Sequence, residues 1–196
     1  MIGGRAAIFV DGGYLDHVRR GFGAIGKIDF RIFFEELAAP AELLRAYYYH
    51  CLPYQSAQPT QEEARRFGSM QRFFDALDRL PRAEVRKGEL AYRGQDRDGK
   101  PIFVQKRVDS LMATDLVMLS VKHLITEAVV VTGDSDLLPA ITIAKNEGVV
   151  VRLAHGVGEH RPHNDLWIEA DERLALTREW LSRCCQPALP PDGAVE

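Results

Sequence analysis

The stretch AAIFVDGG, residues 6–13, holds five consecutive apolar residues followed by an acid and two glycines. An apolar run without polar alternation is typical of a central parallel strand that is covered on both faces. This strand ends at Asp11, and Gly12 and Gly13 permit a tight turn into the next element. The stretch EAVVVTGDSD, residues 127–136, has the same form, because a second buried strand runs into acids.

Strands and helices alternate along the rest of the chain. Further strands are expected at residues 43–51, 83–90, 101–107 and 148–154. Helices are expected at residues 14–20, 30–38, 61–80, 109–124, 136–146, 164–170 and 174–185. This alternation predicts an α/β fold with a mostly parallel central sheet flanked by helices. We expect a single domain over residues 1–185 and a flexible, Pro-rich C-terminal tail at residues 186–196.

The composition fits an ordinary globular protein of one domain: 196 residues, of which 46% are hydrophobic and 27% charged. The three cysteines form no zinc-binding spacing and, being odd in number, no disulfide framework. No apolar run reaches the roughly 18 residues that span a membrane, so no membrane partner is expected. The cytoplasm is the expected location.

The net charge is −3, which gives no overall attraction to nucleic acid. Residues 82–107, however, hold eight bases and four acids, a local charge of +4. This segment is either a solvated hairpin or a basic rim that holds a phosphate backbone. The candidate phosphate contacts within it are Arg93, Arg97, Lys106 and Arg107.

Acids gather where the two buried strands end. Asp134 and Asp136 are two residues apart. One Asp suffices to cap a helix, so the second needs another role, whereas Asp11 could simply cap the helix that follows it. Ligands bind at the carboxyl edge of an open α/β sheet. Carboxylates that converge there repel one another unless a cation neutralises them. Oxygen ligands select Mg²⁺ or Mn²⁺, which serve phosphoryl chemistry, so the sequence favours a metal-dependent nuclease.

A further acidic pair, Asp109 and Asp115, lies in one predicted helix. Six residues correspond to about 600° of rotation, which leaves the two side chains about 120° apart. Both can reach one cleft only if Asp109 caps the helix from just outside it. Asp115 lies three residues after Met112 and directly before Leu116, so it borders the apolar face of the helix. A carboxylate there needs a hydrogen-bonding partner or a metal.

Four motifs together resemble the NYN domain of the PIN-like superfamily, and most closely its LabA-like branch. They are AIFVDGGYL, KRVDSLMATDL, VVVTGDSDLLPAI and NDLWIEAD, and the resemblance covers residues 5–175. It implies a three-layer PIN-like fold and metal-dependent ribonuclease activity. The catalytic acids that it implies are Asp11, Asp109, Asp115, Asp134 and Asp136, with Asp11, Asp134, Asp136 and Asp115 as metal ligands. Many members carry Asn shortly after the first acid, where this chain has Tyr14.

The expected function is an endoribonuclease that acts on single-stranded RNA with one or two Mg²⁺ or Mn²⁺ ions. The main alternative is a catalytically inactive RNA- or protein-binding module on the same fold. A phosphatase of the haloacid dehalogenase type would need an acid two residues after Asp11, where Gly13 stands. A flap endonuclease would need more acids and a longer helical arch. The sequence leaves the oligomeric state open, a homodimer included.

Overall fold

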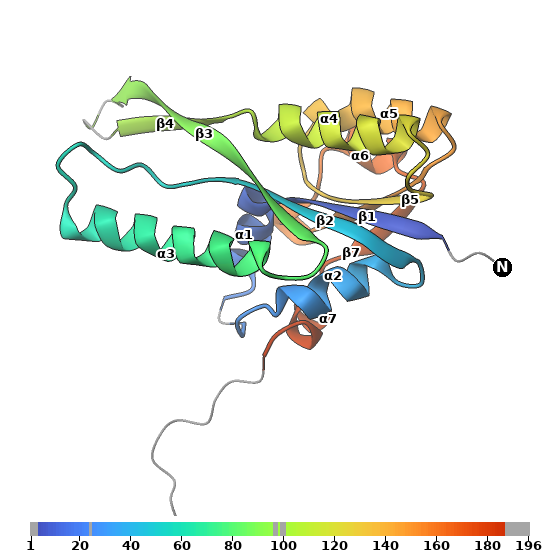
Figure 1. Ribbon diagram of the computed structural model, residues 1–196, viewed down its shortest axis with the longest axis horizontal. Helices are drawn as coiled ribbons and strands as arrows, with labels where there is room; N and C mark the ends of the chain where they lie inside the picture. Colours follow the sequence, from blue (N-terminus) through green and yellow to red (C-terminus); the bar gives the residue numbers. More distant parts are fainter. Residues whose placement is uncertain (1–3, 24, 96–97, 99–100, 187–196) are drawn as a thin grey trace, which may run out of the picture.

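A seven-stranded sheet in the order β4-β3-β2-β1-β5-β6-β7 forms the centre of the molecule (Figure 1). The structure is a computed structural model, and it describes residues 4–23, 25–95, 98 and 101–186. The strands are β1 (Arg5–Asp11), β2 (Glu42–Cys51), β3 (Ala83–Gln95), β4 (Pro101–Lys106), β5 (Glu127–Val131), β6 (Val150–His155) and β7 (Glu172–Ala175). Neighbouring strands are parallel except for β3 and β4.

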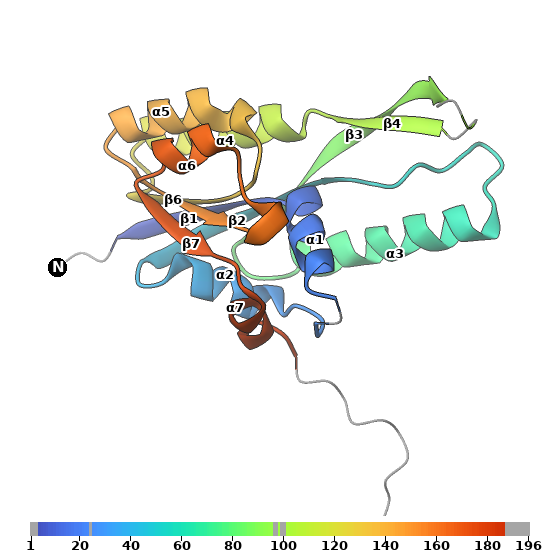
Figure 2. The same cartoon turned by 180° about the vertical axis from the view of Figure 1, so that it is seen from behind.

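Helices cover both faces of this sheet, so the fold has three layers (Figures 1 and 2). The helices are α1 (Gly12–Gly21), α2 (Phe30–Ala38), α3 (Gln61–Asp78), α4 (Val108–Val121), α5 (Leu138–Asn146), α6 (Asn164–Glu169) and α7 (Arg178–Arg183), with short 3₁₀ turns η1 (Ser135–Leu137) and η2 (Gly158–His160). Helices α1, α2, α3 and α7 share one core with Ile8 and Val10 of β1. Helices α4, α5 and α6 share the other with Ala7 and Phe9. The predicted fold class is confirmed.

Strand β1 lies at the centre of the sheet, between β2 and β5. From β1 the chain builds outward through β2 and β3 on one side, and later through β5, β6 and β7 on the other. The carboxyl ends of β1 and β5 therefore flank the point at which the winding direction reverses. In open α/β sheets this switch point is where ligands bind.

The hairpin of β3 and β4 extends beyond the sheet. Residues 83–88 pair in parallel with β2, and from Glu89 onward β3 pairs only with β4. The strand departs at Gly88, where a Cβ atom would lie 2.7 Å from the carbonyl oxygen of Lys106 and 2.9 Å from the Sγ of Cys51. Figures 1 and 2 show this hairpin and α3 projecting from the same end of the sheet.

Replacing Gly88 by Ala is expected to lower the free energy of unfolding by about 1–3 kcal/mol, because the added methyl group would collide with the backbone carbonyl of Lys106 and with the buried side chains of Val108 and Cys51. Urea denaturation measures the change. Gly68→Ala is the matched control, since its Cβ would meet only the tip of Arg72, at 3.4 Å, on α3. That control should be neutral or stabilising by up to about 1 kcal/mol. Equal stability of G88A and the parent would contradict this packing.

Two sequence-based expectations hold only in part. The helix predicted over residues 174–185 is present as the shorter α7, because Leu174 and Ala175 belong to β7, which pairs in parallel with β6. The four residues of β7 carry no β-rich pattern, so tertiary pairing creates this strand. Apolar residues at helical spacing in the helix expected at residues 61–80 predict a core-facing stripe, but only two of the six are buried, because the helix runs past the sheet. The six are Phe67, Met70, Phe73, Phe74, Leu77 and Leu80, of which Phe74 and Leu77 are buried.

The predicted flexible tail lies outside the described residues from position 187 onward. Gln186 itself is placed by a 3.0 Å hydrogen bond from its backbone N–H to the carbonyl oxygen of Lys27. Within the described part of the chain, no helix combines the length and apolar character that crossing a membrane requires.

Candidate active site

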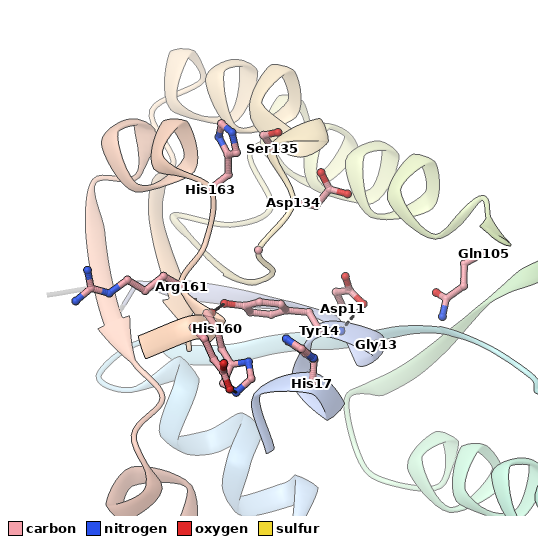
Figure 3. Close-up of a pocket in the computed structure, with 12 residues that line it drawn as sticks. Asp11, Gly13, Tyr14, His17, Gln105, Asp134, Ser135, His160, Arg161 and His163 are labelled. Carbon is pink, nitrogen blue, oxygen red and sulfur yellow. Dashed lines mark hydrogen bonds and ion pairs between the residues drawn. The ribbon is translucent and has the colours of Figure 1, made fainter. Parts of the chain in front are cut away.

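A pocket of about 500 Å³ opens at the carboxyl ends of β1 and β5 (Figure 3). Five segments that are distant in sequence contribute to it: the end of β1, the first turns of α1, strand β4, the turn after β5, and the segment between β6 and α6. The lining residues are Asp11, Gly13, Tyr14, His17, Gln105, Gly133, Asp134, Ser135, Glu159, His160, Arg161 and His163.

Asp11 is a half-buried carboxylate at the end of β1. Its Oδ1 accepts a 3.1 Å hydrogen bond from the backbone N–H of Tyr14, so it does cap α1, as the simpler interpretation of the sequence allowed. Burial raises the pKa of Asp11, the bond from Tyr14 lowers it, and the charge of Asp109 raises it again. Asp11 lines the pocket, so its carboxylate borders the space that a ligand would occupy.

Asp134 enters the same pocket from the neighbouring strand. The last residue of β5, Val131, pairs with Val10, so the turn after β5 emerges beside Asp11. Oδ1 of Asp134 accepts a 3.0 Å hydrogen bond from the backbone N–H of Asp136 and caps η1. Both of these acids are exposed. Figure 3 shows Asp134 above Asp11 across the opening.

Asp109 lies inside the first turn of α4, so the arrangement in which it caps the helix from outside and shares a cleft with Asp115 is not the one found. The helix begins at Val108, and its N-cap is Arg107, whose φ of 71° is left-handed. Burial raises the pKa of Asp109, and the charges of Asp134 and Asp136 raise it further. Asp109 is therefore close enough to the turn at residues 133–136 for the negative charges of Asp134 and Asp136 to act on it.

Asp115 points elsewhere. Its Oδ2 accepts a 2.9 Å hydrogen bond from the hydroxyl of Tyr49 and a 3.0 Å hydrogen bond from the Nε of Arg86. Because α4 is regular from Val108, Asp109 and Asp115 diverge as the rotation of 100° per residue requires. Asp115 is absent from the residues that line the pocket, and its partners lie on β2 and β3. A catalytic role for it stays a prediction.

The donor chemistry of this site fits a hard divalent cation. Asp11, Asp134, Asp136 and Asp109 offer only carboxylate oxygens, which Mg²⁺ and Mn²⁺ prefer. Within the described residues, no group of three or more His, Cys, Asp and Glu side chains is already arranged to hold a metal ion. Closing a shell therefore requires side-chain rotation, which the exposed Asp134 and Asp136 permit. Burial, and after it repulsion between the acids, raises the pKa values of Asp11 and Asp109, and a bound cation would favour their charged forms.

Tyr14 fixes one wall of the pocket, a role that sequence reasoning missed. Its hydroxyl accepts a hydrogen bond from the N–H of Gly156 at 3.0 Å and donates one to the carbonyl oxygen of His160 at 2.8 Å. A Cβ at Gly133 would lie 2.5 Å from its ring. Tyr14 thus ties α1 to the segment after β6, and only its departure from the family pattern could have drawn attention to it.

The histidines at the end of β6 and in the segment after it divide into two groups. His155 is buried, and its Nδ1 lies 2.7 Å from the carbonyl oxygen of Gly156, so it belongs to the core. His160 and His163 line the pocket instead. The ring of His160 packs edge-on against that of His17, with centroids 4.4 Å apart. No spacing in the sequence indicates the contact between His17 and His160, which are 143 residues apart.

The expected phosphate contacts lie in different surroundings. Arg97 lies outside the described residues. Arg107 forms an ion pair with Glu89, which reduces its availability. Arg93 and Lys106 are exposed, and neither is ion-paired with any residue that the structure describes. Gln105 brings the hairpin to the pocket; Lys106 is its neighbour on β4, and Arg93 lies further out, next to Tyr92, which pairs with Phe103.

Comparison with known proteins gives one family and two relatives without a known activity. The sequence profile described as "NYN domain" matches residues 5–174. An uncharacterised protein of Sinorhizobium fredii, y4oD, is 37% identical over 76 residues, which is 39% of this chain and 34% of that protein. The match thus spans about a third of the relative's length. A crystal structure of a Vibrio parahaemolyticus protein of unknown function superimposes with a TM-score of 0.57 at 19% identity. The superposition covers 90% of this chain and 94% of the other, and it supports the fold alone.

Proposed function

This chain belongs to the NYN domain family of PIN-like nucleases, and we propose that it is a metal-dependent ribonuclease that hydrolyses RNA in the pocket between β1 and β5. The observation that carries this proposal is the meeting of Asp11 and Asp134 at the switch point of the sheet. Asp109 and Asp136 do not line the pocket, but Asp109 lies close enough for its charge to act on Asp11 and for those of Asp134 and Asp136 to act on it. Without a bound cation, these carboxylates would repel the phosphates of RNA.

Asp11 and Asp134 would hold the cation, and Asp136 and Asp109 would complete its shell directly or through water. A divalent cation bound there supplies a Lewis acid for the phosphate and lowers the pKa of a bound water. Asp11 is held by the N–H of Tyr14 and is therefore preorganised. Asp134 is more exposed and can adapt to the ligand.

Basic residues beside the pocket would supply the positive charge that holds the RNA backbone. A phosphodiester is repelled by bare carboxylates, so the backbone on either side of the reacting phosphate needs positive charge. Arg93 and Lys106 provide it on the hairpin side of the pocket, and Arg161 lines the opposite side. Figure 3 shows Gln105 and Arg161 at opposite ends of the opening, which leaves room for a strand to cross between them.

We expect the purified chain to cleave labelled single-stranded RNA in Mn²⁺ or Mg²⁺, and to lose this activity fully in EDTA. Restoring excess metal should recover it, because the carboxylates cannot bind the phosphate without a cation. Gel separation of the products measures cleavage. Tight RNA binding without cleavage in either metal would overturn the proposal and favour an inactive RNA-binding module.

Replacing Arg93 and Lys106 by Ala should weaken RNA binding and reduce its dependence on salt. The slope of log affinity against log salt should flatten by about 0.7 for each phosphate that the variant no longer binds. Fluorescence anisotropy across a salt series measures both quantities. The matched control is Lys122→Ala with Arg183→Ala, which makes the same charge change at exposed sites, at the end of α4 and in α7, that do not line the pocket. An unchanged affinity and slope in the hairpin variant would place the backbone elsewhere, with Arg161 as the next candidate.

A further inference from the structure

Three aromatic side chains form a cluster at the hairpin: Tyr92 and the half-buried Phe103 belong to it, and Tyr54 packs against it. Tyr54, from the segment between β2 and α3, stacks on Phe103 with ring centroids 4.6 Å apart and an angle of 29° between the rings. Tyr92 lies opposite Phe103 in the β3–β4 ladder, with centroids 5.8 Å apart. Tyr54 is 43% exposed and Tyr92 is 55% exposed. Exposed rings of this number are costly for a surface that contacts only water.

The cluster lies on the face of the hairpin that leads into the pocket. In the β3–β4 register Tyr92 pairs with Phe103 and Leu90 pairs with Gln105. Side chains two residues apart on a strand share a face, so Phe103 and Gln105 point to the same side, about 7 Å apart along the strand. Gln105 lines the pocket, and a Cβ at Gly13 would lie 3.6 Å from its Nε2. The rings therefore continue the pocket outward along the hairpin.

The position of the cluster beside the pocket identifies the kind of molecule that it fits. A chain whose phosphate enters the pocket would pass over the rings, and the bases of single-stranded nucleic acid stack on exposed aromatic rings. In a duplex the base faces are already stacked on one another and cannot reach the rings. Arg93 and Lys106 alternate with Tyr92 and Gln105 along their strands, so they point to the other face of the hairpin and can hold phosphates only around its edge.

We propose that Tyr54, Tyr92 and Phe103 form a base-stacking platform for the single-stranded RNA whose phosphate enters the acidic pocket. This proposal rests on the proposed function for the identity of the substrate. The platform selects unpaired RNA and holds one or more bases adjacent to the cleaved bond. Because stacking tolerates every base, it gives a preference for single strands with little dependence on sequence.

The platform is tested by RNA binding in the full chain carrying Asp134→Asn, in EDTA, so that no cleavage intervenes. The probes are a short single-stranded oligouridylate, the same strand with abasic residues, and an RNA duplex. Tyr54→Leu and Tyr92→Leu together remove the rings but keep apolar bulk, whereas Tyr54→Phe with Tyr92→Phe keeps the rings. Circular dichroism verifies that each variant is folded.

The Leu variant should bind the oligouridylate more weakly, by on the order of tenfold for each base that loses its ring. It should bind the abasic strand as the parent does, and the Phe variant should bind both strands as the parent does. Equal loss on the abasic strand, or equal affinity of all three proteins for the oligouridylate, would overturn the platform. Tighter binding of the duplex than of the single strand would also overturn it.

These outcomes are separable from those of the proposed function. Metal-dependent cleavage with no effect of the Leu substitutions on binding would leave the nuclease intact and remove the platform. Binding that depends on the rings, in a chain that never cleaves RNA, would support the platform and overturn the nuclease. If the Leu variant is misfolded, 2-aminopurine placed in the oligonucleotide decides the matter in the protein that keeps its rings: stacking quenches its fluorescence, and unchanged fluorescence in the complex contradicts the proposal.

Discussion

Replacing Asp134 by Asn should reduce RNA cleavage by at least about 100-fold while the protein keeps its fold. The Asn side chain retains an oxygen that can accept the hydrogen bond from the N–H of Asp136, so η1 remains capped. What it loses is the negative charge that draws a divalent cation toward Asp11. The expected loss is therefore in turnover, with little change in the melting temperature.

Asp29→Asn is the matched control for this variant. Asp29 also caps a helix, accepting hydrogen bonds from the N–H groups of Arg31 and Ile32 at the start of α2, but it does not line the pocket. The same chemical change should leave cleavage at the parental level there. Equal activity of D134N and the parent, measured on purified proteins under identical metal concentrations, would remove Asp134 from the site.

Replacing Asp115 by Ala should lower the free energy of unfolding by about 2–3 kcal/mol. The carboxylate is only 16% exposed and accepts hydrogen bonds from the Tyr49 hydroxyl and from Arg86. Tyr49 is fully buried, so its hydroxyl would lose its partner in a region that water does not reach. For a chain of this length the melting temperature should fall by roughly 4–12 °C.

Two further variants separate this supporting role from catalysis. Asp115→Asn keeps the shape and one acceptor, so it should cost less stability than Asp115→Ala and leave most of the cleavage activity. Tyr49→Phe should cost about 1–2 kcal/mol, and combining it with Asp115→Ala should be less than additive because the two groups share one hydrogen bond. Complete loss of activity in a stable, metal-saturated D115N protein would instead assign Asp115 to the catalytic set.

Most of the fold could be predicted because its central strands depend on local pattern. AAIFV and AVVV are apolar without alternation, which in a chain of this length requires a strand covered on both faces. Strand β7 could not be predicted, since its residues acquire their conformation only by pairing with β6. The burial of α3 was overestimated for a related reason: periodicity shows which side of a helix is apolar but not how far the sheet beneath it extends.

The candidate site was predictable to the extent that strand ends determine it. Asp11 and Asp134 follow buried strands, and parallel pairing of β1 with β5 brings those ends together. The partners of Asp115 depend on how α4 packs over β2 and β3, which no spacing reports. Tyr14 shows the same limit, because its hydrogen bonds join segments about 140 residues apart in sequence.

The central claim is that Asp11 and Asp134 together bind a divalent cation, and counting bound Mn²⁺ by electron paramagnetic resonance tests it most directly. The parent should bind one or two equivalents of Mn²⁺. Asp11→Asn and Asp134→Asn should each lose bound metal, whereas Asp29→Asn, which lies outside the pocket, should keep it. Mn²⁺ binding that is equal in all four proteins, or absent from the parent, would contradict the account.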